Sequence, residues 1–438
     1  MSSHKMLLSI LLSVCILISA AEGRADSGIS SPTSFPVPRL GPEVRISTPC
    51  SPTDFNRYLP GAAYDSIHNQ YLVVWYSQYP GNAGIYAQRV SSSGARVGSW
   101  FAISTGSNDR ATPAVVFSAT SQEYLVVWVY DTNDDHVHYD IWGRTVVWDG
   151  SSMGVETQIF TWANRAFTSP RVAWDSVHNQ FMVISSVYDT QNFWWNDIAG
   201  KLVMSDGSTP YSGFQVYQDP AVHPHQGDIT YNPAADEYFV VWTETNSATG
   251  DDIYGAKVAW NGGITRSAYA LADETTNDSF PAIATNRGDA YFLTYQSYDD
   301  AASKSSIRFR LLNLVGDPYY SDDPAPGGVF LVKDLTKPDV ENIPGTSKWL
   351  FTAEYSADSG AQAWAFIVER GHHSVALHSS TPVADWPSWE IMNPTLTAGS
   401  PGFLITYEGN NASIPGLVQH IYGRILNTNT LFLPIVMR

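Results

Sequence analysis

The sequence is poor in basic residues and in cysteine. It has 24 Lys and Arg against 42 Asp and Glu, which gives a formal net charge of −18. This deficit argues against nucleic acid or an anionic membrane as a partner, because both select surfaces rich in Lys and Arg. The two cysteines are Cys15 and Cys50. Since Cys15 lies in an N-terminal apolar run that signal cleavage removes, we expect a mature chain without an internal disulfide, stabilised by packing.

Long apolar runs are also scarce. The run Met6–Ser19 has the length of the hydrophobic part of a signal peptide, and small residues between Ala20 and Ala25 offer cleavage sites. No other stretch reaches the roughly 18 apolar residues that a membrane span requires. We therefore predict a signal peptide at residues 1–25, a Ser/Pro-rich linker at residues 26–42, no membrane span, and a secreted or cell-surface location.

What the sequence does contain is a repeat of about 55 residues. Each unit has a strongly apolar strand that opens on an aromatic residue, and a second strand of the type DIYGxRV follows it. The opening residues are Tyr71, Tyr124, Phe181, Tyr238, Tyr291, Trp349 and Phe403. In six of the seven units a proline lies nine to eleven residues upstream, and a short outer strand closes most units. Each unit therefore predicts four strands, the first of which starts at the proline.

A single four-stranded sheet cannot bury both of its faces, but seven such sheets packed around a ring can. We predict an all-β fold, a seven-bladed β-propeller over residues 43–427 with four antiparallel strands per blade and a C-terminal tail at 428–438. The segment Val44–Ser47 precedes the first unit by the interval expected of an outer strand. This N-terminal strand is predicted to complete the last blade and close the ring; Leu431–Val436 is the alternative.

Two stretches of twelve residues are nearly identical, YDSIHNQYLVVW at Tyr64–Trp75 and WDSVHNQFMVIS at Trp174–Ser185. They fall in blades one and three, where the first strand turns into the second. Asp, Ser and Asn favour such turns because their side chains bond to the nearby backbone. We therefore interpret His68 and His178 as turn residues and not as ligands.

The YLVVW…DIYGxRV repeats resemble those of exported bacterial seven-bladed β-propellers, a group whose members mostly lack an assigned activity. The resemblance covers the chain from about Val44 to Asn427. It implies the fold and an exported location, and it does not imply a ligand.

Aromatic residues in predicted loops are the main candidates for ligand binding. Trp194 and Trp195 are predicted between the second and third strands of blade three, and Trp386 and Trp389 before the first strand of blade seven. Flat rings beside Asp and Asn suit a sugar ring or a protein partner. We predict a monomer that binds a glycan or a surface protein without catalysis; a structural component of the cell surface or of adhesion is a further alternative.

A second candidate group lies where the inner strand of blade four begins, in the sequence HPHQGD. On an extended chain His223 and His225 lie on one side, and we expect their rings to point to the mouth of the central channel, where Asp228 follows. Such a group suits a metal ion or general acid–base chemistry, and a structural turn is the alternative. A polysaccharide-cleaving enzyme, hydrolase or lyase-like, is therefore the alternative function, and it would need channel carboxylates to converge. The candidate carboxylates are Asp228, Asp278, Asp339 and Glu390.

The most polar loop, in blade two, suggests a metal site. Asp131, Asn133 and Asp135 follow the D-x-N-x-D spacing of calcium loops, in which alternate oxygens surround the ion. The sixth and twelfth positions are His136 and Trp142, where calcium loops have Gly and Glu. A transition-metal site formed by His136, His138 and Asp140, and a plain solvated loop, stay open as alternatives. We expect no resident cofactor, with calcium at this loop as the exception.

Overall fold

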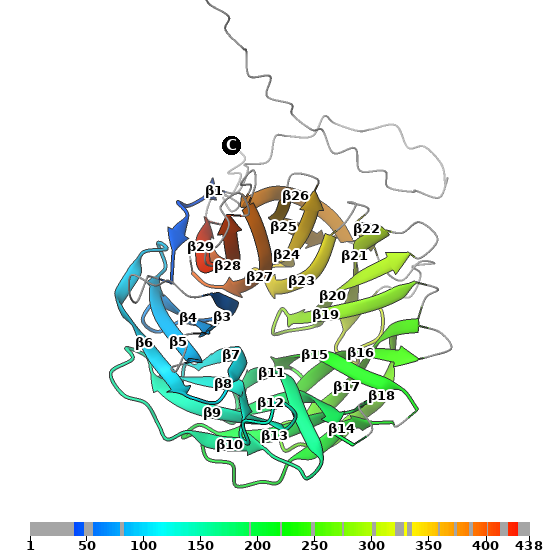
Figure 1. The fold of residues 1–438 in the computed structure, drawn as a ribbon. Coiled ribbons are helices and arrows are strands. Elements are labelled where there is room, and N and C mark those ends of the chain that lie inside the picture. The colour runs from blue at the N-terminus through cyan, green and yellow to red at the C-terminus, as the bar shows by residue number, and fades with distance from the viewer. Residues whose placement is uncertain are drawn as a thin grey trace, which may run out of the picture. The chain divides into compact units, whose positions relative to one another are not determined.

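Seven antiparallel sheets surround a central axis, with the first strand of each sheet innermost (Figure 1). The computed structural model describes residues 39–47, 56–78, 83–191, 194–219, 221–246, 250–273, 276–299, 304–319, 328–330, 335–357, 360–371, 375–384, 389–400, 402–411 and 419–427. The predicted signal peptide, Cys50 and the C-terminal tail lie outside these ranges. Within them, no helix is long and apolar enough to cross a membrane. The predicted seven-bladed β-propeller is confirmed.

Each of the first six blades consists of four consecutive strands, which follow one another in chain order from the axis outwards. Blades one and two comprise β3 (Arg57–Asp65), β4 (Gln70–Ser77), β5 (Ala83–Ser91), β6 (Arg96–Gly106), β7 (Arg110–Ser118), β8 (Glu123–Asp131), β9 (Tyr139–Val147) and β10 (Thr157–Phe160). Blades three and four comprise β11 (Arg165–Asp175), β12 (Gln180–Asp189), β13 (Trp194–Met204), β14 (Phe214–Gln218), β15 (His223–Asn232), β16 (Glu237–Asn246), β17 (Gly250–Ala259) and β18 (Ile264–Ala272). Blades five and six comprise β19 (Asn277–Thr285), β20 (Ala290–Asp299), β21 (Lys304–Asn313), β22 (Gly328–Phe330), β23 (Leu335–Asn342), β24 (Lys348–Ala357), β25 (Gly360–Arg370) and β26 (Val375–Ala384).

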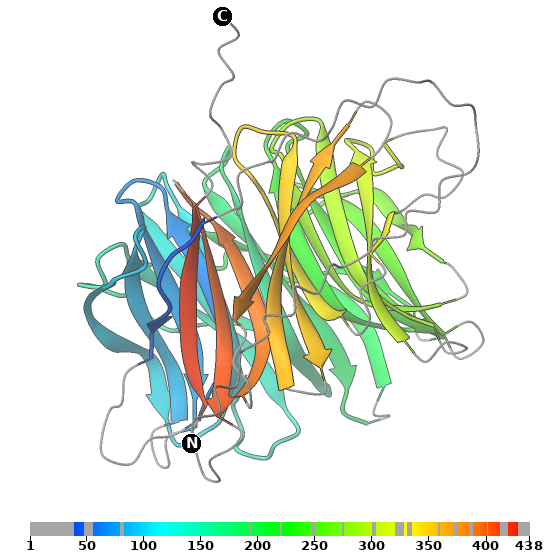
Figure 2. The same ribbon diagram turned by 90° about the horizontal axis from the view of Figure 1, so that it is seen from above.

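The seventh blade joins the two ends of the chain. Its inner strands are β27 (Trp389–Ala398), β28 (Gly402–Asn411) and β29 (His420–Asn427), and β1 (Arg39–Leu40) and β2 (Val44–Arg45) pair with β29 on the outside. Figure 2 shows this N-terminal segment in dark blue beside β29 in red. The predicted closure by an N-terminal strand is thus confirmed, and its pairing already starts within the segment predicted as a linker. The alternative strand Leu431–Val436 lies outside the described residues.

The apolar second strands are buried because each lies between two strands of its own sheet and between two neighbouring blades. Every residue of β4 is buried, which explains its continuous apolar sequence in place of an alternating pattern. The hydrophobic core accordingly consists of seven clusters, each shared by two adjacent blades. The aromatic residue that opens each second strand is fully buried in one of them, as for Tyr71 and Tyr124.

Each inner strand contains a bulge, which lies at the repeat's proline in six blades and at Gly227 in blade four. The strand pairing skips the residues around Pro60 in blade one, and the same shift occurs in all seven blades. In every blade the first bulged residue has a positive φ between 45° and 53°: Leu59, Thr112, Ser169, Gln226, Phe280, Lys337 and Asn393. The prediction that the proline starts the strand was therefore wrong, since β3 begins at Arg57. A proline is tolerated inside these strands because a bulge on a free edge needs no backbone N–H there.

Candidate functional site

The bulges of the seven inner strands enclose a cavity of about 430 Å³. Its wall is formed by the residues of each bulge and those that follow, most of which are small or apolar. The charged side chains that line it are Arg171, Asp228, Lys337 and Asp339. Two of the four carboxylates predicted at the channel, Asp228 and Asp339, therefore do reach it, and they come from different blades.

Asp228 and Asp339 occupy the same position in blades four and six, two residues after the positive-φ residue. Asp228 Oδ2 accepts a hydrogen bond from the backbone N–H of Ile283 in blade five (2.8 Å), and Asp339 Oδ2 accepts one from Leu396 in blade seven (2.7 Å). Both donors lie on the inner edge of the next blade, where no further strand is present to pair with them. The two carboxyl groups are thus held in place by the backbone of a neighbouring blade.

The channel raises the pKa of its carboxyl groups. Burial is the main cause for Asp339, and the negative charge of Asp228 adds to it, so that the pKa of Asp339 rises to about 7. Burial also raises the pKa of Asp228, against the opposing effect of the Arg171 guanidinium, whose Nε lies 3.9 Å from Asp228 Oδ1. Glu341, two residues beyond Asp339 on β23, has a pKa raised to about 8 by burial and by these two carboxylates. The inner strands therefore carry carboxyl groups that exchange protons near neutral pH.

A second polar layer links the blades at the bulges themselves. Glu408 Oε1 accepts a hydrogen bond from the N–H of Leu59 (2.7 Å), and Glu354 Oε2 accepts one from the N–H of Asn393 (3.2 Å). Lys337 Nζ lies 3.5 Å from Glu354 Oε2. In both hydrogen bonds, a glutamate of the second strand of one blade accepts from a backbone N–H in the bulge of the next blade. This layer stabilises the positive-φ conformation of the bulges.

The loop-rich face of the propeller carries the loops between second and third strands and those that lead into each inner strand. On this face Trp195 stacks with His225 (ring centroids 6.0 Å apart, planes at 21°), and Tyr188 packs edge-on against Trp195 at 5.3 Å. His223 Nδ1–H donates to the carbonyl oxygen of Trp195 (3.1 Å). The two histidines therefore face Trp195 of blade three, and our expectation that they point to the channel mouth was wrong.

The imidazole of His225 is in its neutral form at this rim. Its Nδ1–H donates to the carbonyl oxygen of His223 (2.9 Å), which leaves Nε2 as the acceptor. Burial lowers the pKa of His225, and the nearby charge of Asp251 opposes this shift. The rim thus combines a half-buried indole ring with a neutral acceptor. His225 and Asp228 lie on one strand on either side of its bulge, opposite Thr243 and Val241 of the second strand. Two residues of strand separate these positions, so the rim and the channel wall are about 7 Å apart along β15.

Most of the other residues predicted for this site have side chains outside the described residues. Trp194 and Trp389 open strands β13 and β27, although both were predicted in loops, and their side chains lie outside the described residues. The same holds for the side chain of Glu390 and for Trp386 as a whole. Asp278 is fully buried within β19, where it accepts a hydrogen bond from Thr276, and it does not line the cavity.

The predicted calcium loop uses its carboxylates to shape the turn. Asp131 accepts hydrogen bonds from the backbone N–H groups of Asp135 and His136 (3.2 and 2.9 Å). Asp135 accepts hydrogen bonds from Val137 and His138 (2.9 and 2.8 Å), and these bonds lower its pKa. Asn133 is the middle residue of this turn. Calcium binding by Asp131, Asn133 and Asp135 stays a prediction.

Arg171 and Glu341 are the site residues that we did not single out from the sequence. A signal for Arg171 was available in the repeat itself, at the position directly after the bulge. There four repeats have Gly, Ala or Thr, and three have a charged residue: Arg171, Asp228 and Asp339. Comparing equivalent positions between repeats, and not scanning for motifs, would have indicated them.

Comparison with known proteins supports the fold. The sequence matches no protein-family model and no curated protein. The chain is similar in structure to a protein of unknown function from Dyadobacter fermentans DSM 18053 (TM-score 0.50, 12% identity, covering 90% of this chain and 100% of that one). It is also similar to an ulvan lyase of a new polysaccharide lyase family, PL25, bound to -[GlcA(1-4)Rha3S]- (TM-score 0.54, 8% identity, covering 85% and 94%). At these identities the likeness shows the propeller fold alone.

Proposed function

We propose that this chain is an exported propeller that binds an oligosaccharide at its loop-rich face, between the Trp195 rim and the mouth of the channel. The observation that carries this proposal is the stack of Trp195 on His225 beside a channel with four charged side chains. A half-buried indole offers a flat apolar surface to the C–H face of a sugar ring, and neutral acceptors and carboxyl groups nearby bind its hydroxyl groups.

Binding is tested by screening the mature chain against a glycan array and titrating each hit by calorimetry. Trp195→Ala removes the stacking surface, and we expect a loss of about 2 kcal/mol, or roughly thirtyfold in Kd. Trp260→Ala is the matched control, because Trp260 is an exposed tryptophan next to β17 on the opposite face. Absence of any glycan hit, or equal affinities of wild type and Trp195→Ala, would overturn the proposal and favour a protein partner.

Cleavage of a polysaccharide is the second candidate function. It is favoured by one observation, the elevated pKa of Asp339 beside Asp228 and Arg171 in one enclosed channel. A carboxyl group with a pKa near 7 is suited to general-acid catalysis, and a neighbouring cation stabilises negative charge. Incubation with acidic polysaccharides, followed by assays for new reducing ends and for unsaturated uronates, tests it. Activity that Asp339→Asn abolishes would establish an enzyme, and no product from any substrate would leave binding as the function.

A further inference from the structure

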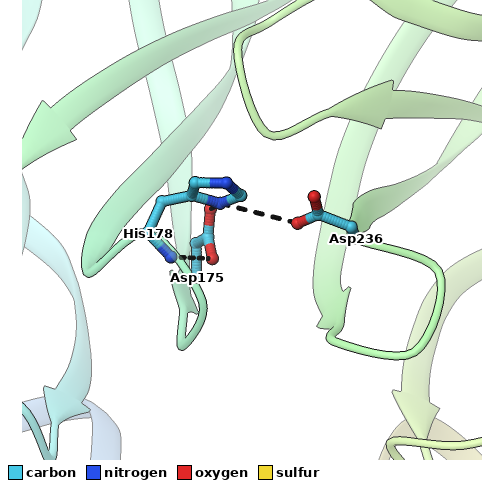
Figure 3. A group of neighbouring side chains, drawn as sticks. All are labelled: Asp175, His178 and Asp236. Atoms are coloured by element: carbon cyan, nitrogen blue, oxygen red, sulfur yellow. Dashed lines mark hydrogen bonds and ion pairs between the residues drawn. The ribbon is translucent and has the colours of Figure 1, made fainter.

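On the opposite face of the propeller, the turns between first and second strands bring two carboxylates and an imidazole together (Figure 3). Asp175 and His178 belong to the turn of blade three, and Asp236 belongs to the turn of blade four. His178 Nδ1 lies 2.8 Å from Asp175 Oδ2 and 3.5 Å from Asp236 Oδ1. One possible ligand atom from each residue lies within 4.8 Å of the other two. We propose that these three residues bind a divalent transition-metal ion such as Zn²⁺.

The separations fit a metal site. Zn²⁺ is bound by imidazole nitrogen and carboxylate oxygen at about 2.0–2.2 Å. Two such bonds place their ligand atoms 2.8 and 3.5 Å apart when the angles at the metal are roughly 85° and 115°, which lie on either side of the tetrahedral angle. His178 and Asp236 are partly exposed, so a water molecule can complete the coordination from the solvent side.

The surrounding contacts hold the ligands in place. Asp175 Oδ1 accepts hydrogen bonds from the backbone N–H groups of Val177 and His178 (both 2.9 Å), which directs the other oxygen, Oδ2, towards the imidazole. The imidazole is fixed by stacking on Trp260, with ring centroids 4.2 Å apart. Metal sites typically have neighbouring groups that hold the ligand side chains in position in this way. His178 is a turn residue, as we interpreted it from the sequence. The proposal departs from the other half of that interpretation, that His178 is not a ligand, because the structure adds the carboxylate of Asp236.

Blade one provides an internal comparison. Asp65 and His68 form the same turn, with a distance of 2.7 Å between Asp65 Oδ2 and His68 Nδ1. The turn position of blade two that corresponds to Asp236 is Gln122, also with a positive φ. Asn occupies this position in blade one, where Asn69 accepts the hydrogen bond from Tyr64 that Asp236 accepts from Tyr231. An amide therefore satisfies the turn, and the carboxylate of Asp236 adds only negative charge beside His178.

The test is a titration of the untagged, EDTA-treated mature chain with Zn²⁺, followed by calorimetry and by the shift in Tm. We expect Asp236→Asn, which keeps the turn and the hydrogen bond from Tyr231, to remove one site or weaken it at least about tenfold. His178→Ala should do the same. His68→Ala is the matched control, because it removes an equivalent turn histidine without a third ligand, and it should leave binding within about twofold.

Three results would overturn the proposal. One is a wild-type protein that shows neither heat nor a rise in Tm with Zn²⁺. The second is binding by Asp236→Asn as tight as that of the wild type. The third is an equal loss in His68→Ala and His178→Ala, which would place the ion elsewhere. Measuring Tm of each variant without metal shows that the fold is intact. Since glycans are proposed to bind the other face, the glycan titration can fail without affecting this result.

Discussion

The closure of the ring can be tested at one side chain. Ile46 follows the outer strand β2, is fully buried, and packs with Tyr71, Leu404 and Ile421 between the last and the first blade. Replacing a buried isoleucine by alanine costs about 3 kcal/mol, within the usual range of 2–5 kcal/mol. The propeller has about 390 residues, so its entropy of unfolding, at about 2.1 cal/mol/K per residue, is about 0.8 kcal/mol/K. Ile46→Ala should therefore lower Tm by about 4 °C.

Differential scanning calorimetry of Ile46→Ala measures this shift directly. Ile67→Ala is the matched control, since Ile67 lies in an exposed turn (53% exposed) and its truncation should change stability by less than about 0.5 kcal/mol. Deletion through Ser47 should lower Tm further, because it also removes the pairing of β1 and β2 and exposes the edge of β29 to aggregation. Equal Tm values for Ile46→Ala and Ile67→Ala would refute the view that this segment locks the ring.

Two further predictions concern buried charges. Glu341 has a pKa of about 8 in the fold against an ordinary value of 4.5, so the folded chain keeps a proton there that the unfolded chain loses, and the stability of the fold declines as pH rises from about 5 to 8. Glu341→Gln should therefore match the wild-type Tm at pH 5 and exceed it at pH 8.5. A difference in Tm between the variant and the wild type that stays constant with pH would contradict this pKa assignment. Lys257 has a side chain only 3% exposed and pairs with Glu237, so Lys257→Met should cost about 3–5 kcal/mol by leaving that carboxylate unpaired, which an unchanged Tm would disprove.

The blades could be predicted from the sequence because the core positions are periodic. The aromatic residue that opens each second strand is buried between blades in every repeat, so the spacing of Tyr71, Tyr124 and their equivalents follows the ring directly. The closing strand could be predicted for the same reason, from its interval to the first unit. The bulges could not be predicted from the sequence. A proline that begins a strand and a proline that follows a positive-φ residue inside a strand give the same sequence pattern, and only the pairing register distinguishes the two cases.

The site was predictable only in part, because it depends on contacts between blades. Trp195 was identified separately from the group of His225 and Asp228. The contact between them was not predicted, since the angle between neighbouring blades decides which side chains meet. The sequence has no local sign that His225 turns to Trp195 while Asp228 turns to the backbone of Ile283. Residue type thus indicates the chemistry available to a propeller, and the ring geometry selects the residues that act together.

Contacts between neighbouring blades also explain why the twelve-residue stretch occurs twice. His68 stacks on Trp148 of blade two at 3.7 Å, and His178 stacks on Trp260 of blade four at 4.2 Å. In both cases the glutamine two residues after the histidine donates its side-chain amide to the carbonyl oxygen of that tryptophan. In these two pairs of blades, the odd blade supplies the turn and the even blade supplies the tryptophan. Blade five lacks the histidine in its turn, and blade six lacks the tryptophan at the corresponding position. The histidine and the tryptophan are therefore both missing from this pair of blades. The two turns differ in their third neighbour. Of these two described turns, the one in blade three has a second carboxylate, that of Asp236, beside its histidine, and it is the turn at which we propose a metal ion.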